Sequence, residues 1–327
     1  MLRAGRVLLM ASLLTTAFSS PAQQITSQPV RSLLVNVLDR NGNAIRDLTK
    51  DNFRVKVNGH PASVLDASYS LSPGRIVVLL DMSESMAGEK GDKSKWQIAK
   101  DAVTDLVTMT PTGVPIALVA FSDHVSTTIE FAHGRPAIAE WLNQGPSQRE
   151  KLKGRTALFD AALAALKLME PASPGDVIYA VTDGGDNGSN ISEDDMKKML
   201  LQSETRLFVF LFVEPLPTKE ERSGGDSVLN LARDTGGNVF GNSSHSSDLG
   251  PSFSSWDVMY DRDGRTRDKI RLYTQALNTQ VNGFYTLRVA VPFSRKQSKI
   301  KLEIVKETGK AWKDVTFTFP RLLPGHQ

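Results

Sequence analysis

The chain has 327 residues, of which 40% are hydrophobic and 23% are charged, a composition typical of a globular protein with a sizeable core. It contains no cysteine, which excludes disulfides, zinc–thiolate sites, iron–sulfur clusters and thiol nucleophiles. The formal net charge is +3 and no basic run stands out. Binding to nucleic acid needs a clustered basic face, so we expect no nucleic-acid partner.

The first residues have the pattern of a secretory signal peptide. Arg3 and Arg6 form a basic start, residues 7–18 are mostly apolar, and small residues precede a cleavage point near Ala22. The apolar stretch is shorter than the roughly 20 residues that a membrane-spanning helix needs. We therefore expect cleavage of residues 1–22 rather than a membrane anchor, no later transmembrane segment, and a secreted or periplasmic protein. An exported protein without cysteine favours a bacterial source.

Residues 23–72 predict a small N-terminal β module. A strand is expected over residues 32–37, and a single helical turn follows near residues 48–53. The next strand begins at Phe53 and leads to Asn58-Gly59, a strong hairpin signal because both residues tolerate positive φ. We expect the chain to return over residues 64–69, which makes three short strands.

Residues 73–282 alternate apolar runs with helical patterns, which predicts an α/β domain with a mostly parallel sheet. An alternating stretch after a three-residue link predicts one antiparallel edge strand. Residues 241–263, rich in Ser, Gly and Asn, predict an exposed loop. The expected strands cover 76–80, 116–121, 125–131, 177–181, 207–213 and 238–240, and the expected helices cover 95–109, 136–143, 157–169, 192–203, 227–235 and 266–281.

The C-terminal residues 283–327 return to a β pattern. Strands are expected over residues 284–291, 299–305 and 312–319, each with alternating apolar and polar positions. The two β-rich flanks bracket the α/β domain in the sequence. We expect them to pair into one small domain.

Oxygen-bearing side chains stand where three segments of the expected sheet end. The polar sequence Asp81-x-Ser83-x-Ser85 directly follows an apolar strand, Thr156 precedes a helix, and Asp183 ends another apolar strand. Ligands of open α/β sheets bind just outside the carboxyl ends of the strands. Two carboxylates and three hydroxyls are hard donors that suit Mg²⁺ but are too few to close around it. A position is therefore left for water or for a carboxylate of a ligand.

These five residues resemble the metal-ion-dependent adhesion site of von Willebrand factor type A domains. The resemblance covers about residues 73–282 and includes the Thr235–Phe240 segment, which is similar to the last strand of that family. It implies a Rossmann-like sheet of six strands in the order 3-2-1-4-5-6, with the third antiparallel and helices on both faces. It also implies that the serines and the threonine contact a cation, with the aspartates often acting through water. The first flank is similar to a β module that precedes such domains in exported bacterial proteins.

The resemblance implies an exported, metal-dependent protein-binding module of the adhesion type. The expected cation is Mg²⁺, with Mn²⁺ and Ca²⁺ also suited, and an Asp or Glu of a partner protein would complete its coordination. We expect no enzymatic activity and no catalytic residues. The loops around the metal would form the partner-binding rim, which we assign to Met86, Ala87, Gly88, Gly184, Gly185, Asp186 and Asn187.

Other functions are less well supported by the residues. A phosphotransferase of the haloacid dehalogenase type would use Asp81 as nucleophile, but it needs a second Asp two residues later, where Ser83 stands. The glycine-containing segment 88–94 is a poor phosphate loop because Asp92 would repel phosphate. Neither a histidine metal motif nor a Gly-x-Ser-x-Gly elbow occurs. A metal-independent envelope scaffold, with the aspartates acting only as helix caps, remains an alternative.

Overall fold

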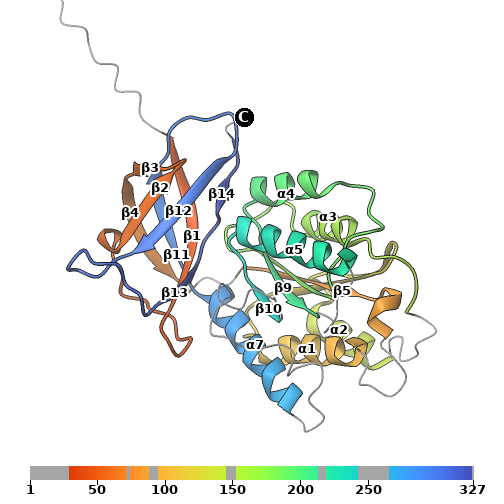
Figure 1. Cartoon of the computed structure of the whole chain (residues 1–327). Coiled ribbons are helices and arrows are strands. Elements are labelled where there is room, and N and C mark those ends of the chain that lie inside the picture. The colour runs from red at the N-terminus through yellow and green to blue at the C-terminus, as the bar shows by residue number, and fades with distance from the viewer. Residues whose placement is uncertain are drawn as a thin grey trace, which may run out of the picture.

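The computed structural model describes residues 29–71, 74–87, 95–144, 152–212, 219–241 and 265–325. The expected signal peptide and nearly all of the expected loop over 241–263 lie outside these ranges. The described residues form an α/β domain and, beside it, a β sandwich built from both flanks of the chain (Figure 1). Within these ranges, no helix combines the length and the apolar character needed to span a bilayer.

The α/β domain is centred on a sheet of six strands in the order β10-β9-β8-β5-β6-β7. Every pairing in it is parallel except the one between β6 and β7. The predicted strand order and the antiparallel third strand are therefore confirmed. The link between β6 and β7 is too short for a crossover, so only an antiparallel return fits. The strands are β5 (Ile76–Asp81), β6 (Ile116–Phe121), β7 (Val125–Ile129), β8 (Val177–Thr182), β9 (Arg206–Leu211) and β10 (Val239–Gly241).

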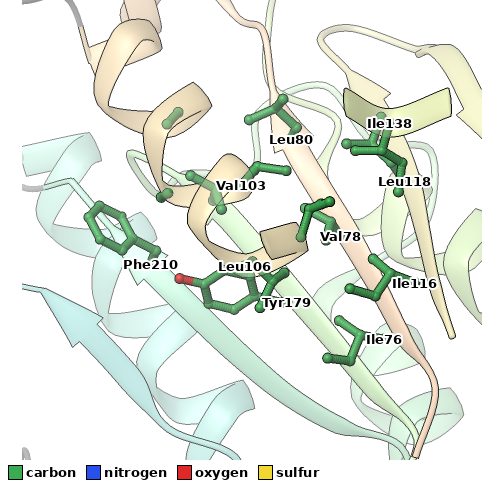
Figure 2. Packing of buried hydrophobic residues seen from close by; sticks show 14 of the residues in the cluster. Ile76, Val78, Leu80, Val103, Leu106, Ile116, Leu118, Ile138, Tyr179 and Phe210 are labelled. Carbon is green, nitrogen blue, oxygen red and sulfur yellow. The ribbon is translucent and has the colours of Figure 1, made fainter. Parts of the chain in front are cut away.

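The central strand β5 is buried along its whole length. Ile76, Val78 and Leu80 point to one face of the sheet, where they meet Val103 and Leu106 of the first long helix (Figure 2). The alternate side chains of β5 pack against the helices of the opposite face. Because both faces are covered, the strand is apolar at every position rather than alternating.

In the part of the chain that the structure describes, three helices cover each face of this sheet. The face seen in Figure 2 carries α1 (Lys95–Met109), α2 (Gly134–Gln144) and α7 (Arg265–Asn282). The opposite face carries α3 (Leu158–Leu168), α4 (Glu193–Gln202) and α5 (Lys219–Asp234). The predicted helices agree within two residues except α5, which begins at Lys219 rather than at residue 227. Its first half holds polar residues and two glycines, so the apolar periodicity that predicts a helix is absent there.

The two flanks pair into one β sandwich, as predicted. Its sheets have the orders β13-β1-β11-β4 and β14-β12-β2-β3, so each sheet mixes strands from both ends of the chain. Apolar side chains from both inner faces form a separate core. The strands are β1 (Val30–Leu38), β2 (Phe53–Val57), β3 (His60–Ala62), β4 (Val64–Ser70), β11 (Phe284–Ala290), β12 (Ser298–Ile304), β13 (Thr316–Thr318) and β14 (Leu322–Leu323), and a 3₁₀ turn covers Lys50–Asn52.

The predicted N-terminal hairpin is wrong in its second strand. The turn at Asn58 and Gly59 forms, with φ of 49° and 88°, but the chain returns over β3. Residues 64–70 instead cross to the other sheet and pair with β11. The tight turn places the residues directly after it in register with β2, so no room is left for a later segment on that edge. The described part of the N-terminal module therefore has four strands, β1 to β4, rather than three. In the C-terminal flank, the predicted strand over 312–319 shortens to β13.

A buried polar contact joins the sandwich to the α/β domain. Arg206 of β9 donates from Nη1 to Asn36 Oδ1 of β1 and to the carbonyl oxygen of Gln280, both at 3.0 Å. The Arg206 guanidinium lies 5.4 Å from the ring centre of Phe208 and 4.9 Å from that of Phe284. Burial lowers the pKa of Arg206 to about 10, because the charged form is separated from water. The two parts of the chain thus share a buried junction.

Candidate metal centre

The carboxylate of Asp81 stands at the carboxyl end of β5 and is completely buried. Its Oδ1 accepts a hydrogen bond of 2.8 Å from the backbone N–H of Ser83. Its Oδ2 accepts one of 2.6 Å from Thr182 Oγ1, at the end of the neighbouring strand β8. These bonds fix the orientation of the carboxylate at the edge of the sheet.

The two serines follow Asp81 in a tight loop that leads into a 3₁₀ turn over Glu84–Ala87. Ser83 is buried and Ser85 is exposed, and their hydroxyl oxygens lie 3.0 Å apart. The loop is attached to the end of β6, because the backbone N–H of Met82 donates to the carbonyl of Phe121 at 2.7 Å. Two hydroxyls therefore face one another beside the Asp81 carboxylate.

Thr156 lies in the loop that precedes α3 and is buried. The loop is attached to the end of β6, because the N–H of Ala157 donates to the carbonyl of Ser122 at 2.7 Å. Its neighbours Lys153 and Arg155 are both exposed. They place positive charge beside the candidate site.

Asp183 follows β8 and begins a loop that turns through two glycines. Gly184 and Gly185 have φ of 97° and 71°, values that side chains with a Cβ rarely adopt. Helix α5 lies directly against this loop, since a Cβ on Gly224 would be 2.3 Å from the Cα of Gly185. The loop can therefore keep its path only beside a glycine of α5.

Hydrogen bonds tie the three loops together in a closed set. The first loop meets the second where the N–H of Glu84 donates to the carbonyl of Gly154 at 3.3 Å. The second meets the third where the N–H of Thr156 donates to Asn187 Oδ1 at 2.8 Å and the N–H of Asn187 donates back to the carbonyl of Thr156 at 3.0 Å. The bond between Thr182 and Asp81 links the third loop to the first. The residues predicted as ligands are thus carried on three mutually bonded loops at one edge of the sheet.

The electrostatics of this edge are unusual because acidic groups are buried there. Burial raises the pKa of Asp81 to about 7, and the negative charge of nearby Asp183 adds to the rise. Lys95, the first residue of α1, places its Nζ 2.9 Å from Asp183 Oδ2. Only 8% of the Lys95 side chain and 12% of the Asp183 side chain are exposed. A cationic group therefore already lies against one of the two carboxylates.

The residues fit a hard divalent cation. A completely buried carboxylate with a second carboxylate nearby is stabilised by positive charge, and the loop after β5 offers the hydroxyl oxygens of Ser83 and Ser85. In the part of the chain that the structure describes, no group of three or more His, Cys, Asp or Glu side chains is arranged to hold a metal. The sequence does not predict such a group. The predicted ligand set contains only two carboxylates, and its other three donors are hydroxyls.

A family model described as the von Willebrand factor type A domain matches residues 76–185. The matched segment is similar to type A domains and covers about a third of the chain. It runs from the start of β5 to Gly185 and contains the five predicted ligands. No curated protein matches the chain.

Solved structures show weaker similarities. An aerotolerance-related membrane protein from Bacteroides fragilis has 15% identity and a TM-score of 0.45, covering 64% of this chain and 98% of that one. BatB from Bacteroides thetaiotaomicron has 15% identity and a TM-score of 0.44, covering 63% and 98%. A von Willebrand factor type A protein from Catenulispora acidiphila has 14% identity and a TM-score of 0.41, covering 93% and 76%. The fold described above does not depend on these similarities.

The predicted partner-binding rim needs correction. Met86 is completely buried in the core beneath the loop, so it cannot contact a partner. Gly184 is also buried, and the carboxylate of Asp186 accepts from the backbone N–H of Phe159 and from Ser189. Gly88 lies outside the described residues. Of the predicted rim, Asn187 is exposed and Ala87, Gly185 and Asp186 are half-buried, and the predicted ligand Ser85 is exposed.

Sequence reasoning misses three features of the candidate site. Thr182 orients Asp81, and its only signal is a hydroxyl residue immediately before the Asp183 that was noticed. Lys95 stands at a helix N-terminus, where a positive charge is disfavoured, and that mismatch is a weak signal of a special role. Gly224 in α5 gave no signal, because contact with the distant Gly185 is a property of the fold.

Proposed function

We propose that this protein is an exported binding protein that captures an acidic residue of a partner protein through a divalent cation held by its type A domain. The supporting observation is the set of hydrogen bonds that ties the three loops, and with them Asp81, Thr156 and Asp183, to one edge of the sheet. The proposed ligands are those two aspartates and Ser83, Ser85 and Thr156, and the proposed cation is Mg²⁺, with Mn²⁺ and Ca²⁺ as substitutes. The bound cation would supply an open coordination position for a carboxylate oxygen.

The surface beside the site supports an acidic partner. Lys153 and Arg155 are exposed on either side of the loop residue Gly154, and Arg155 directly precedes the proposed ligand Thr156. Exposed positive charges steer an acidic protein toward the site and raise its association rate, most strongly at low salt. The partner-binding surface would then consist of Ser85, Ala87, Gly185 and Asn187 together with these two basic residues.

We propose a binding role rather than an enzymatic one. Both oxygens of Asp81 already accept hydrogen bonds, one from a backbone N–H and one from Thr182. Position 83, where a phosphotransferase of the haloacid dehalogenase type has its acid, is a serine that lies 3.0 Å from the hydroxyl of Ser85. Assay of the protein with a generic phosphate ester and Mg²⁺ tests this choice. Turnover that is lost in Asp81→Asn would replace the binding role with phosphoryl transfer.

The decisive experiment for the site is calorimetric titration of the purified protein with Mg²⁺. Wild type should bind one cation, and Asp81→Ala should show no binding while retaining the wild-type circular dichroism spectrum. Asp123→Asn is a matched control, because Asp123 is a partly exposed carboxylate beside the second loop that belongs to no predicted ligand set. Equal Mg²⁺ affinity in wild type and Asp81→Ala would disprove the site.

The partner class is tested with an array of acidic peptides in the presence of Mg²⁺. Binding should disappear with EDTA and when the Asp or Glu of a bound peptide is replaced by Asn or Gln. Peptide binding that survives EDTA would favour the metal-independent scaffold. Export is tested separately by N-terminal sequencing of the protein from its native host, which should begin at Gln23 if the first 22 residues are a signal peptide.

A further inference from the structure

We propose that Lys95 is a built-in counter-ion that competes with the divalent cation for Asp183 and leaves the loaded site positively charged. This inference rests on the proposed metal site and names a residue that sets its affinity and its preference for acidic ligands. The observation behind it is the 2.9 Å contact between Lys95 Nζ and Asp183 Oδ2, with both side chains largely removed from water.

The position of Lys95 is costly in two respects. Burying an ammonium group loses hydration that only a close anion can replace. Lys95 is also the first residue of α1, where the partial positive charge of the helix N-terminus repels a cation. A lysine held at that point needs strong compensation, and the carboxylate of Asp183 supplies part of it.

The same contact changes the charge of the site. Without a metal, Asp81 and Asp183 in their charged forms would repel one another, and the Lys95 ammonium offsets part of that repulsion. With a divalent cation bound, the two carboxylates, the ammonium and the cation leave a formal charge of +1. The same site without Lys95 would be neutral. Lys95 therefore opposes entry of the cation but favours the subsequent binding of a carboxylate.

The competition predicts the result of removing the charge. Lys95→Met keeps a long apolar side chain and should bind Mg²⁺ about ten- to a thousandfold more tightly than wild type, a range that lies between the Coulomb energies of neighbouring charges in water and near a protein surface. Lys95→Arg retains the charge and should stay near the wild-type affinity. Lys100→Met makes the same substitution on the same helix but away from Asp183, and it should bind Mg²⁺ as wild type does.

Calorimetry with Mg²⁺ alone is the primary measurement, and the melting temperature is the second. Metal-free Lys95→Met should melt at a lower temperature than wild type, because its two acidic groups lack their counter-ion, and Mg²⁺ should raise its melting temperature by more than it raises that of wild type. A purely structural ion pair would give the lower melting temperature without the larger Mg²⁺ response. If Lys95→Met does not fold, Lys95→Gln, which keeps a polar group beside Asp183, replaces it in the same titrations.

The predicted preference for acidic ligands is tested by titrating the protein with glutarate at saturating Mg²⁺. Wild type should bind glutarate several-fold more tightly than Lys95→Met, and equal binding would overturn the predicted preference for acidic ligands. Unchanged or weaker Mg²⁺ binding by Lys95→Met, with wild type binding Mg²⁺ normally, would overturn the competition and leave the proposed function intact. If neither wild type nor Lys95→Met binds Mg²⁺, both the proposed metal site and the proposed role of Lys95 are wrong.

Discussion

Thr182 Oγ1 donates a hydrogen bond of 2.6 Å to Asp81 Oδ2, and this bond joins the carboxyl ends of β8 and β5. The same hydroxyl accepts a hydrogen bond of 3.1 Å from the N–H of Gly184. One threonine therefore orients the buried carboxylate and also holds the start of the glycine loop that follows Asp183. Hydroxyl groups that both donate and accept in a buried network contribute to the precision of a site as well as to stability.

Replacing Thr182 by Val should weaken both the orientation of the Asp81 carboxylate and the attachment of the glycine loop. The isosteric apolar side chain leaves Asp81 Oδ2 and the N–H of Gly184 without their partner, so we expect a loss of about 1–3 kcal/mol in the free energy of unfolding. Affinity for Mg²⁺ should fall as well. Urea denaturation and calorimetry measure the two effects. Thr182→Ser keeps the hydroxyl and is the control, and a Val variant with unchanged Mg²⁺ affinity would contradict the orienting role.

Asp81→Asn should stabilise the metal-free protein at pH 8. The pKa of Asp81 rises from 3.8 to about 7 in the folded state, so folding favours the protonated form. Stability from this group is fully present below pH 3.8 and is lost as the pH rises through 7. At pH 8 the buried carboxylate is charged, and its neutral replacement should gain a few kcal/mol, since each pKa unit corresponds to about 1.4 kcal/mol.

The measurement is urea denaturation at pH 5 and pH 8, with and without Mg²⁺. Wild type should be stabilised by Mg²⁺ at pH 8, whereas Asp81→Asn should show a smaller dependence on pH and no response to Mg²⁺. Asp123→Asn should behave as wild type with respect to Mg²⁺. An Asp81→Asn protein that is less stable than wild type at pH 8 would show that the carboxylate is compensated without a cation.

The contact between α5 and the loop after β8 predicts different effects for two adjacent glycines. A Cβ on Gly224 would lie 2.3 Å from the Cα of Gly185, so Gly224→Ala should push the helix off the loop and cost about 1–3 kcal/mol. A Cβ on Gly225 would meet only Leu211 Cδ2 at 3.8 Å, an ordinary contact. Gly225→Ala should therefore be neutral or slightly stabilising.

Thermal denaturation and Mg²⁺ titration of these two variants form a matched test. Gly224→Ala should lower both the melting temperature and the Mg²⁺ affinity, because Gly185 stands two residues after Asp183. Gly225→Ala should leave the affinity unchanged. Equal effects of the two substitutions would mean that the helix does not support the metal loop.

Arg206→Met should weaken the junction between the β sandwich and the α/β domain. The substitution removes the hydrogen bonds to Asn36 Oδ1 and to the carbonyl of Gln280, and it leaves both buried acceptors with one donor fewer. We expect a loss of about 2–4 kcal/mol and separate unfolding of the two parts in calorimetry. Arg288→Met changes an exposed arginine of β11 and should change the free energy of unfolding by no more than about 0.5 kcal/mol. A single sharp transition at the wild-type temperature would contradict this role of Arg206.

The sequence by itself determined the type of each element in the α/β domain and the place of the candidate site. Runs such as Ile76–Leu80 are short and apolar at every position, which is typical of strands covered on both faces, and the polar residues that follow them mark the edge where a site is expected. Asp81, Ser83, Ser85 and Asp183 follow apolar strands and Thr156 precedes a helix, and this combination is the pattern that resembles the type A domain site. The pairing of the two flanks could also be expected, since neither flank can bury its apolar face alone.

Only the tertiary structure decided which residues surround the donors. Thr182, Lys95 and Gly224 contact site residues that are distant along the chain or lie on neighbouring elements, and no local pattern encodes such contacts. Met86 was assigned to the surface from its position beside Ser85, yet the 3₁₀ turn directs it into the core. Likewise, the turn at Asn58 and Gly59 was recognised, but the partner of β4 depends on β11, which lies more than two hundred residues later. Periodicity is a local property, whereas contacts between loops and register between distant strands arise only when the whole chain has packed.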